Sequence, residues 1–244
     1  MTRAALLAGA VTLSAATVAL AYVPGTKTVF RHFAEKQAFE RVSAGTLLGY
    51  GVLMGSPVQA PLRMEMTFPG TCKTQVDFPT GRSGVTVTAT KFSVEGAPPP
   101  PFEAFVALAC PIEAMKNVPI VDAEAAIAKL ATSWGIDQGV TSLSRLDRRA
   151  AFVVGARPRD LSKPQIWFDK DTSRPLRIIA KYGGKLWDIR FTDPGSIATS
   201  RRTARVADVW QGNERLLNMH FMSAEIDKNG PEAPPNDEDT SEED

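Results

Sequence analysis

Short stretches in which apolar and polar residues alternate dominate this chain, and the clearest lie within residues 165–191. Trp187, Ile189 and Phe191 alternate with charged residues, which is typical of a strand with one buried and one exposed face. Two turn signals divide the region, the charged run DKDTSRP and the pair Gly183-Gly184. A Gly-Gly pair favours a hairpin because both positions accept positive φ. The pattern therefore predicts an antiparallel meander.

Similar runs occur on both sides of this meander. Further strands are predicted at residues 46–53, 62–68, 73–78, 85–92, 141–146, 149–155, 201–210 and 215–226. Proline, glycine and asparagine separate most of these runs, as expected for short strands joined by turns. The pattern predicts about ten or eleven antiparallel strands in all.

A helical period replaces the alternation in three places. Apolar residues recur three and four positions apart in residues 26–41, 102–116 and 123–134, which is the pattern of helices with one buried face. Asp122 is the expected N-cap of the third helix, and Gly135 its end. Residues 95–101 (EGAPPPP) are expected to form a stiff loop before the helical insert 102–134. We expect these helices to cover one face of the sheet.

The two ends of the chain differ from the rest. Residues 4–20 are uncharged, follow Arg3 and end in Ala19-Leu20-Ala21. These features indicate a signal peptide over residues 1–21 that is cleaved after Ala21, and therefore a periplasmic protein. An uncleaved N-terminal anchor is the alternative, since the run is just long enough to cross a bilayer.

Charge is distributed unevenly, although the net charge is only +1. Residues 22–224 carry 26 basic and 18 acidic side chains, whereas residues 225–244 carry nine acidic and one basic. A proline-rich acidic segment cannot bury enough apolar surface to fold. We expect a single domain over residues 22–228 and a disordered acidic tail over residues 229–244, which could screen a basic patch formed by Arg201, Arg202 and Arg205.

The chain offers little for catalysis or metal binding. Its two histidines, His32 and His220, lie far apart, and it has no nucleophile, phosphate-loop or metalloprotease motif. We therefore expect no enzyme activity, no metal and no cofactor. In an exported protein the only two cysteines, Cys72 and Cys110, are expected to form a disulfide that ties the helical insert to the sheet. The alternative is two free, buried thiols.

One region resembles a known family. Gly155-Ala156, the run Gln165-x-Trp167-x-Asp169 and Pro175-Leu176-Arg177 resemble motifs of the periplasmic outer-membrane lipoprotein carriers, the localisation factor A/B superfamily. The resemblance extends over residues 26–226, and its specific part is residues 140–192. It implies an α+β fold, in which a curved antiparallel β-sheet forms an incomplete barrel and helices pack on its open concave side.

The same resemblance implies a ligand site. A non-enzymatic carrier of this kind would bind acyl chains or a lipidated client in the concave face of the half-barrel, in outer-membrane lipoprotein sorting or envelope maintenance. The candidate lining residues are Phe68, Trp167, Ile179, Trp187, Ile189, Phe191, Leu217, Met219 and Phe221. The same side chains could instead form a closed core. The chain would then be a protein-interaction module, such as a sensor or a subunit of an envelope complex.

The expected partners follow from these two readings. They are lipid or lipoprotein acyl chains, or an envelope protein, with transient membrane contact and no nucleic acid. The chain would act as a monomer or within an envelope complex.

Overall fold

The computed structural model describes residues 23–38, 44–68, 70–79, 81–88, 91–113, 115, 118–192 and 204–227. The expected signal peptide, the acidic tail, and Arg201 and Arg202 of the basic patch lie outside these residues. The helices are α1 (Thr26–Ala38), α2 (Pro100–Glu113) and α3 (Ile120–Ser133). Within the described part of the chain, none of them combines the length and the apolar composition needed to cross a membrane.

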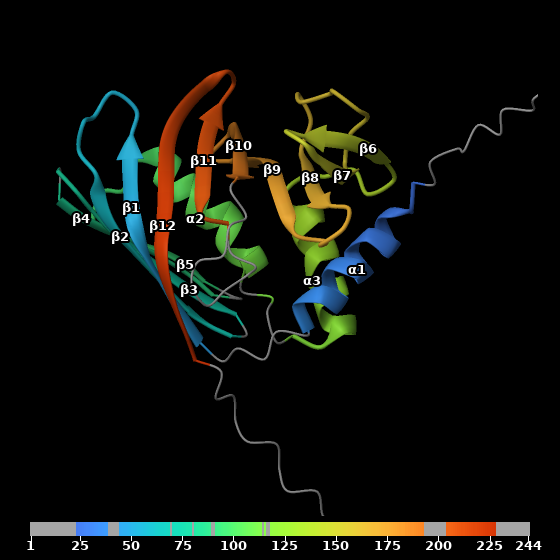
Figure 1. Cartoon of the computed structure of the whole chain (residues 1–244), viewed down its shortest axis with the longest axis horizontal. Coiled ribbons are helices and arrows are strands. Elements are labelled where there is room, and N and C mark those ends of the chain that lie inside the picture. Colours follow the sequence, from blue (N-terminus) through green and yellow to red (C-terminus); the bar gives the residue numbers. More distant parts are fainter. Residues whose placement is uncertain are drawn as a thin grey trace, which may run out of the picture.

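The strands form one antiparallel sheet (Figure 1). They are β1 (Ala44–Leu53), β2 (Ala60–Thr67), β3 (Thr71–Phe78), β4 (Gly81–Val87), β5 (Phe92–Glu95), β6 (Thr141–Leu146), β7 (Arg149–Val154), β8 (Gln165–Asp169), β9 (Pro175–Tyr182), β10 (Lys185–Thr192), β11 (Val206–Gln211) and β12 (Glu214–Asp227). Their order is β5-β4-β3-β2-β1-β12-β11-β10-β9-β8-β7-β6. Two meanders, β1–β5 and β6–β12, are therefore joined where β1 pairs with β12.

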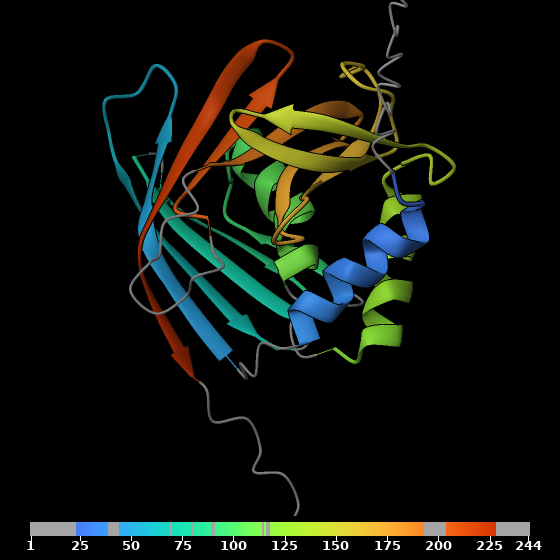
Figure 2. The ribbon, with the colours of Figure 1, turned by 45° about the vertical axis from the view of Figure 1, so that its right-hand side comes forward.

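The sheet curls without closing. Its edge strands, β5 and β6, are not paired with each other, and Figure 2 shows the sheet curving around α2, with α1 and α3 side by side at the opening. The hydrophobic core lies between the concave face and the helices. The predicted fold class, a curved incomplete barrel with helices on its concave side, is confirmed.

The strand count is twelve rather than ten or eleven, because the run 85–92 is two strands. Thr88 and Lys91 close a turn inside it: the backbone amide of Thr88 donates to the carbonyl of Lys91 at 2.8 Å, and the amide of Lys91 donates to Thr88 Oγ1 at 2.9 Å. Threonines favour strands through their branched side chains, but their hydroxyls also stabilise turns. The turn splits the run into β4 and β5.

Two predicted helix boundaries are wrong. The helix α2 begins at Pro100, inside the expected stiff loop. Proline is well suited to the first turn of a helix, because its φ is already helical and its missing amide has no helical partner there. The helix α3 begins at Ile120, and its N-cap is Pro119 rather than Asp122. Asp122 lies in the first turn, where its charge interacts favourably with the helix dipole.

Candidate functional site

The concave face of the sheet carries most of the predicted lining residues. Phe68, Trp187, Ile189, Leu217, Met219 and Phe221 belong to the main hydrophobic cluster, and each is at least nine-tenths buried. Alternation places them there: β10 and β12 each direct every second side chain toward the helices. Phe191 is half-buried and packs at the margin of the cluster.

Trp167 and Ile179 do not lie on this face, and the expectation that they share one lining with the others is wrong. Trp167 packs in a second cluster with Ala151, Val153 and Leu176. Ile179 is paired with Asp188 of β10, whose neighbours Trp187 and Ile189 face the helices. Directly paired residues lie on the same side of a sheet, so Ile179 faces outward with Asp188. Strands β8 and β9 direct Ile166, Phe168 and Ile178 toward the helices instead.

The sequence analysis missed the aromatic residues of the helices that cover the site. Phe30 and Phe33 of α1 pack on Phe168 with ring centroids 6.1 and 5.3 Å apart. Phe105 of α2 lies 6.4 Å from Phe221. All of them fall on the apolar stripes that predicted these helices, so the helical period contained the signal. It does not say which strand each stripe contacts.

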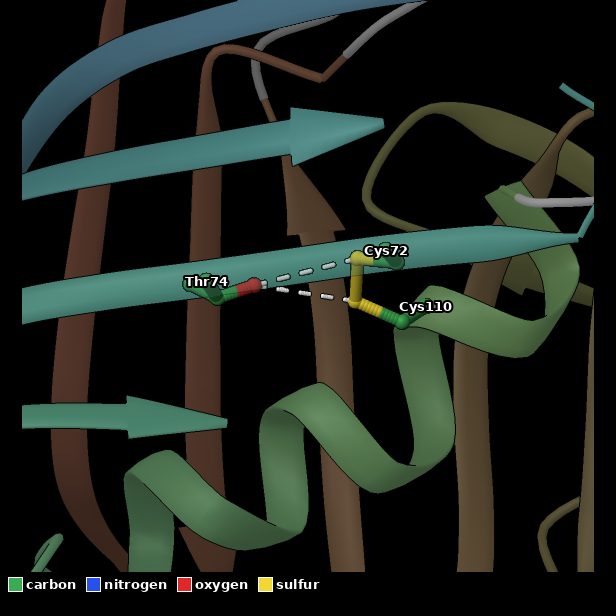
Figure 3. Close-up of a disulfide and its surroundings, with 3 residues drawn as sticks. All are labelled: Cys72, Thr74 and Cys110. Atoms are coloured by element: carbon green, nitrogen blue, oxygen red, sulfur yellow. Dashed lines mark hydrogen bonds between the residues drawn. A yellow bond between two sulfur atoms is a disulfide. The ribbon is translucent and has the colours of Figure 1, made fainter. Parts of the chain in front are cut away.

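Two links hold α2 in the concavity. Near its C-terminal end, a disulfide joins Cys110 to Cys72 of β3, with the two Cα atoms 5.8 Å apart (Figure 3). Thr74 is fully buried beside it, with its hydroxyl 3.8 and 3.7 Å from the sulfurs of Cys72 and Cys110. The predicted disulfide is confirmed, and it attaches the central helix to the sheet.

The second link lies at the other end of α2. The hydroxyl of Tyr182, at the end of β9, donates to the carboxylate of Glu103. Burial and the hydrogen bond to this carboxylate raise the pKa of Tyr182, so the phenol stays protonated and keeps donating. The ring of Tyr182 also lies 5.8 Å from Phe92 of the edge strand β5. This cluster bridges β5, α2 and β9 at one rim of the barrel.

The pair formed by α1 and α3 has no covalent link to the sheet. The hydroxyl of Thr26 donates to the carbonyl of Gln138 at 2.7 Å, which joins the start of α1 to the segment after α3. Between the two helices runs an open groove of about 680 Å³. Phe30 lines this groove and also packs on Phe168 of β8. The groove therefore ends on a side chain that belongs to the concave cluster.

The concavity itself is filled in this structure. A cavity among Leu47, Met64, Phe105 and Phe221 has a volume of only about 20 Å³, which is room for about one water molecule and not for an acyl chain. A ligand chain would therefore have to displace helices. Because α2 is attached at both ends, α1 and α3 are the cover that can move at lower cost.

The β8–β9 turn is organised by Asp169, one of the residues of the family resemblance. Its Oδ1 accepts from the amides of Asp171 and Thr172 at 3.0 and 2.7 Å, and its Oδ2 lies 2.8 Å from Arg149. Burial alone would raise the pKa of Asp169, but the hydrogen bonds from Thr172 and Asp171 and the charge of Arg149 outweigh it and lower the pKa. Asp169 therefore stabilises the β8–β9 turn.

This pKa predicts how stability depends on pH. A carboxylate with a lowered folded-state pKa contributes stability above its unfolded pKa of about 3.9 and loses it as pH falls through the folded value. Asp169→Asn should therefore lower the melting temperature at pH 7, and the difference from wild type should shrink below about pH 4. Thermal unfolding from pH 7 to pH 3 measures it. A difference that stays constant over this range would contradict the assignment.

Among the described residues, no three His, Cys, Asp or Glu side chains lie together in a way that could hold a metal ion. The concave face offers a largely apolar surface. The arrangement is suited to holding an apolar chain or an apolar side-chain surface.

Comparisons with known proteins agree with this architecture. No family model and no curated protein matches the sequence. Solved structures do match. A domain assigned to outer membrane lipoprotein sorting, from Vibrio parahaemolyticus, aligns with a TM-score of 0.50 at 11% identity, covering 84% of this chain and 95% of that chain.

Two further structures are more distant. A LolA superfamily protein from Nitrosomonas europaea aligns with a TM-score of 0.46 at 6% identity, covering 84% of this chain and 94% of the other. A DUF1329 family protein from Desulfovibrio piger aligns with a TM-score of 0.44 at 11% identity, covering 83% and 93%. At such identities the likeness to the Vibrio domain concerns the fold alone. This chain shares the fold of the Vibrio domain, a curved, incomplete barrel with helices on its concave side.

Proposed function

We propose that this chain is a non-enzymatic periplasmic binding protein that holds an acyl chain, or the acyl chain of a lipidated client, against the concave face of its half-barrel. The observation that supports the proposal is an apolar lining that continues from β10 and β12, under α2, to Phe168 of β8, under α1, while α1 and α3 have no disulfide to the sheet. A sheet closed on itself would not need a separate helical cover.

The groove between α1 and α3 gives the ligand a route. It is open to solvent, and its floor includes Phe30, which is 1% exposed and belongs to the concave cluster. Parting α1 from α3 would expose Phe30, Phe33 and Phe168 to the incoming chain. The apolar surface uncovered on these rings would be covered again by the ligand, so the opened state is stabilised by binding.

The tryptophans allow a test that distinguishes the two faces of the sheet. Trp187 lies in the concave cluster and Trp167 on the opposite face. A fatty acid brominated along its chain should quench Trp187 on binding, because quenching by bromine requires close approach. Trp134, at the end of α3, also belongs to the concave cluster, so the comparison is made in a Trp134→Phe background. In that background Trp187→Phe should remove most of the quenchable emission, and the matched control Trp167→Phe should leave it in place.

Ligand-dependent stability provides a second measurement. Saturation at about 100 times the Kd should add about 2.7 kcal/mol to the free energy of unfolding. For a chain of this size that corresponds to a rise in melting temperature of about 5–10 °C. No quenching and no thermal shift with any acyl chain would contradict the proposal. The chain would then be an interaction module that uses the same fold to bind an envelope protein.

A further inference from the structure

The loop between β7 and β8, residues 155–164, combines charge with an exposed apolar side chain. Arg157, Arg159 and Lys163 are exposed, and Leu161 between them is 44% exposed. A single exposed leucine is ordinary on a protein surface. A leucine flanked by three cations combines the two attractions that hold a segment at an anionic membrane interface, burial of apolar surface and attraction to anionic lipids. The concave site does not use this loop.

The loop is held in one conformation. The buried amide of Gln165 donates to the carbonyl of Asp160 at 2.6 Å and to that of Lys163 at 3.0 Å. The carboxylate of Asp160 accepts from the amide and the hydroxyl of Ser162 at 3.2 and 2.7 Å. The acid of the loop is thus engaged by Ser162 and, at 3.7 Å, by Lys163. Arg157 and Arg159 make no ion pair in the described part of the chain.

The position of the loop points to its partner. The amide of Gly155 donates to the carbonyl of Val140 at 2.9 Å, and Thr26 contacts Gln138 and Thr141. The loop therefore begins beside the N-terminal end of α1. Only residues 21–25 separate this end from the uncharged run 4–20, a span of at most about 18 Å. Where this run is kept as an N-terminal anchor, the alternative to cleavage after Ala21, the bilayer that holds it lies close to the loop.

We propose that this end of the molecule is a membrane-contact surface for an anionic bilayer. Leu161 enters the interfacial region, while Arg157, Arg159 and Lys163 bind lipid phosphates. Each basic side chain near an anionic surface contributes about 1 kcal/mol, and the fixed loop lowers the entropy lost on binding. The contact brings the mouth between α1 and α3 to the membrane, and it does not depend on what the concavity holds.

A fluorophore at the loop tests this directly. Leu161→Cys in the full chain is labelled with an environment-sensitive dye, because the two native cysteines are bonded to each other and do not take the label. Vesicles containing phosphatidylglycerol should shift its emission to the blue, and phosphatidylcholine vesicles should not. The matched control is Val58→Cys, which is 42% exposed in the β1–β2 turn, on the opposite side of the molecule from α1 and β6 (Figure 1).

Reversing the charge of two arginines of the loop provides a second test of the membrane contact. In the labelled Leu161→Cys chain, Arg157→Glu with Arg159→Glu should weaken vesicle binding at least about tenfold at physiological salt, whereas Lys91→Glu, at the turn before β5, should not change it. An unchanged emission with phosphatidylglycerol would overturn the proposal. So would an equal response to both lipids, an equal shift at Leu161 and Val58, or an equal effect of the two charge reversals.

Discussion

Replacing Cys72 and Cys110 together by alanine is expected to lower the free energy of unfolding by about 4 kcal/mol. The disulfide closes a separation of 38 residues, and in the chain-entropy view its loss releases that constraint from the unfolded chain. Both side chains are fully buried, so the double variant also loses packing between α2 and β3. Denaturant unfolding without reductant measures the change.

The same variant should bind ligand differently. With its C-terminal end released, α2 becomes a second movable cover, so the double variant should show a larger ligand-induced rise in melting temperature than wild type. Tyr182→Phe serves as the control at the other end of α2, because it removes only the hydrogen bond to Glu103 at a cost of about 1–2 kcal/mol. A double variant within about 1 kcal/mol of wild type would contradict the role given to the disulfide.

The sequence predicts clearly which face of the sheet a residue occupies only where one face of the strand is polar and exposed to solvent. In β10, Asp188 and Arg190 mark the outer face, so the sequence predicts Trp187, Ile189 and Phe191 on the concave side, where the structure has them. In β8 all five residues are buried. Alternation still marks the two faces, because Gln165 and Asp169 share the face of Trp167 while Ile166 and Phe168 share the other. In a strand of five residues that is buried on both faces this signal is weak, and the size and apolar character of Trp167 favoured the wrong face.

The pairing of strands that lie far apart along the chain could not be predicted from the sequence either. The fold depends on β1 pairing with β12, whose residues lie more than 160 positions away, and no local pattern specifies that partner. Gly49 marks the place: a Cβ there would lie 1.8 Å from the carbonyl oxygen of His220. Glycine inside a strand is typical of a close backbone approach, but only the structure shows that the approaching backbone is that of β12.

The outer face of the second meander, β6–β12, carries a buried ionic network. Arg177, one of the residues of the family resemblance, belongs to it. Arg177 and Asp188 are 5% and 8% exposed. Arg177 Nε and Nη2 donate to the two carboxylate oxygens of Asp188 at 2.7 and 2.5 Å. The guanidinium also lies 5.1 Å from the ring of Trp167. These contacts explain why Trp167 faces outward and what the arginine of the Pro-Leu-Arg motif does. Through Arg177, the side chains on the outer face of β8, β9 and β10 contact one another.

Arg177→Met is therefore expected to destabilise the protein by about 3–5 kcal/mol, because it leaves the charge of Asp188 buried with one partner fewer. For a chain of this length the melting temperature should fall by about 6–20 °C. Arg190→Met is the matched control: Arg190 also contacts Asp188, at 2.8 Å, but its side chain is 27% exposed, and Asp188 keeps Arg177. Its cost should be about 1 kcal/mol.

A double variant separates the buried charge from lost packing. Arg177→Met combined with Asp188→Leu removes the charge together with its partner, and replacing a buried ion pair by apolar side chains is often neutral or stabilising. The double variant should therefore recover most of the stability that Arg177→Met loses. Calorimetry on wild type, Arg177→Met, Asp188→Leu and the double variant measures the coupling. If Arg177→Met costs no more than Arg190→Met, or if adding Asp188→Leu lowers stability further, the network is not what holds the outer face of β9 and β10 together.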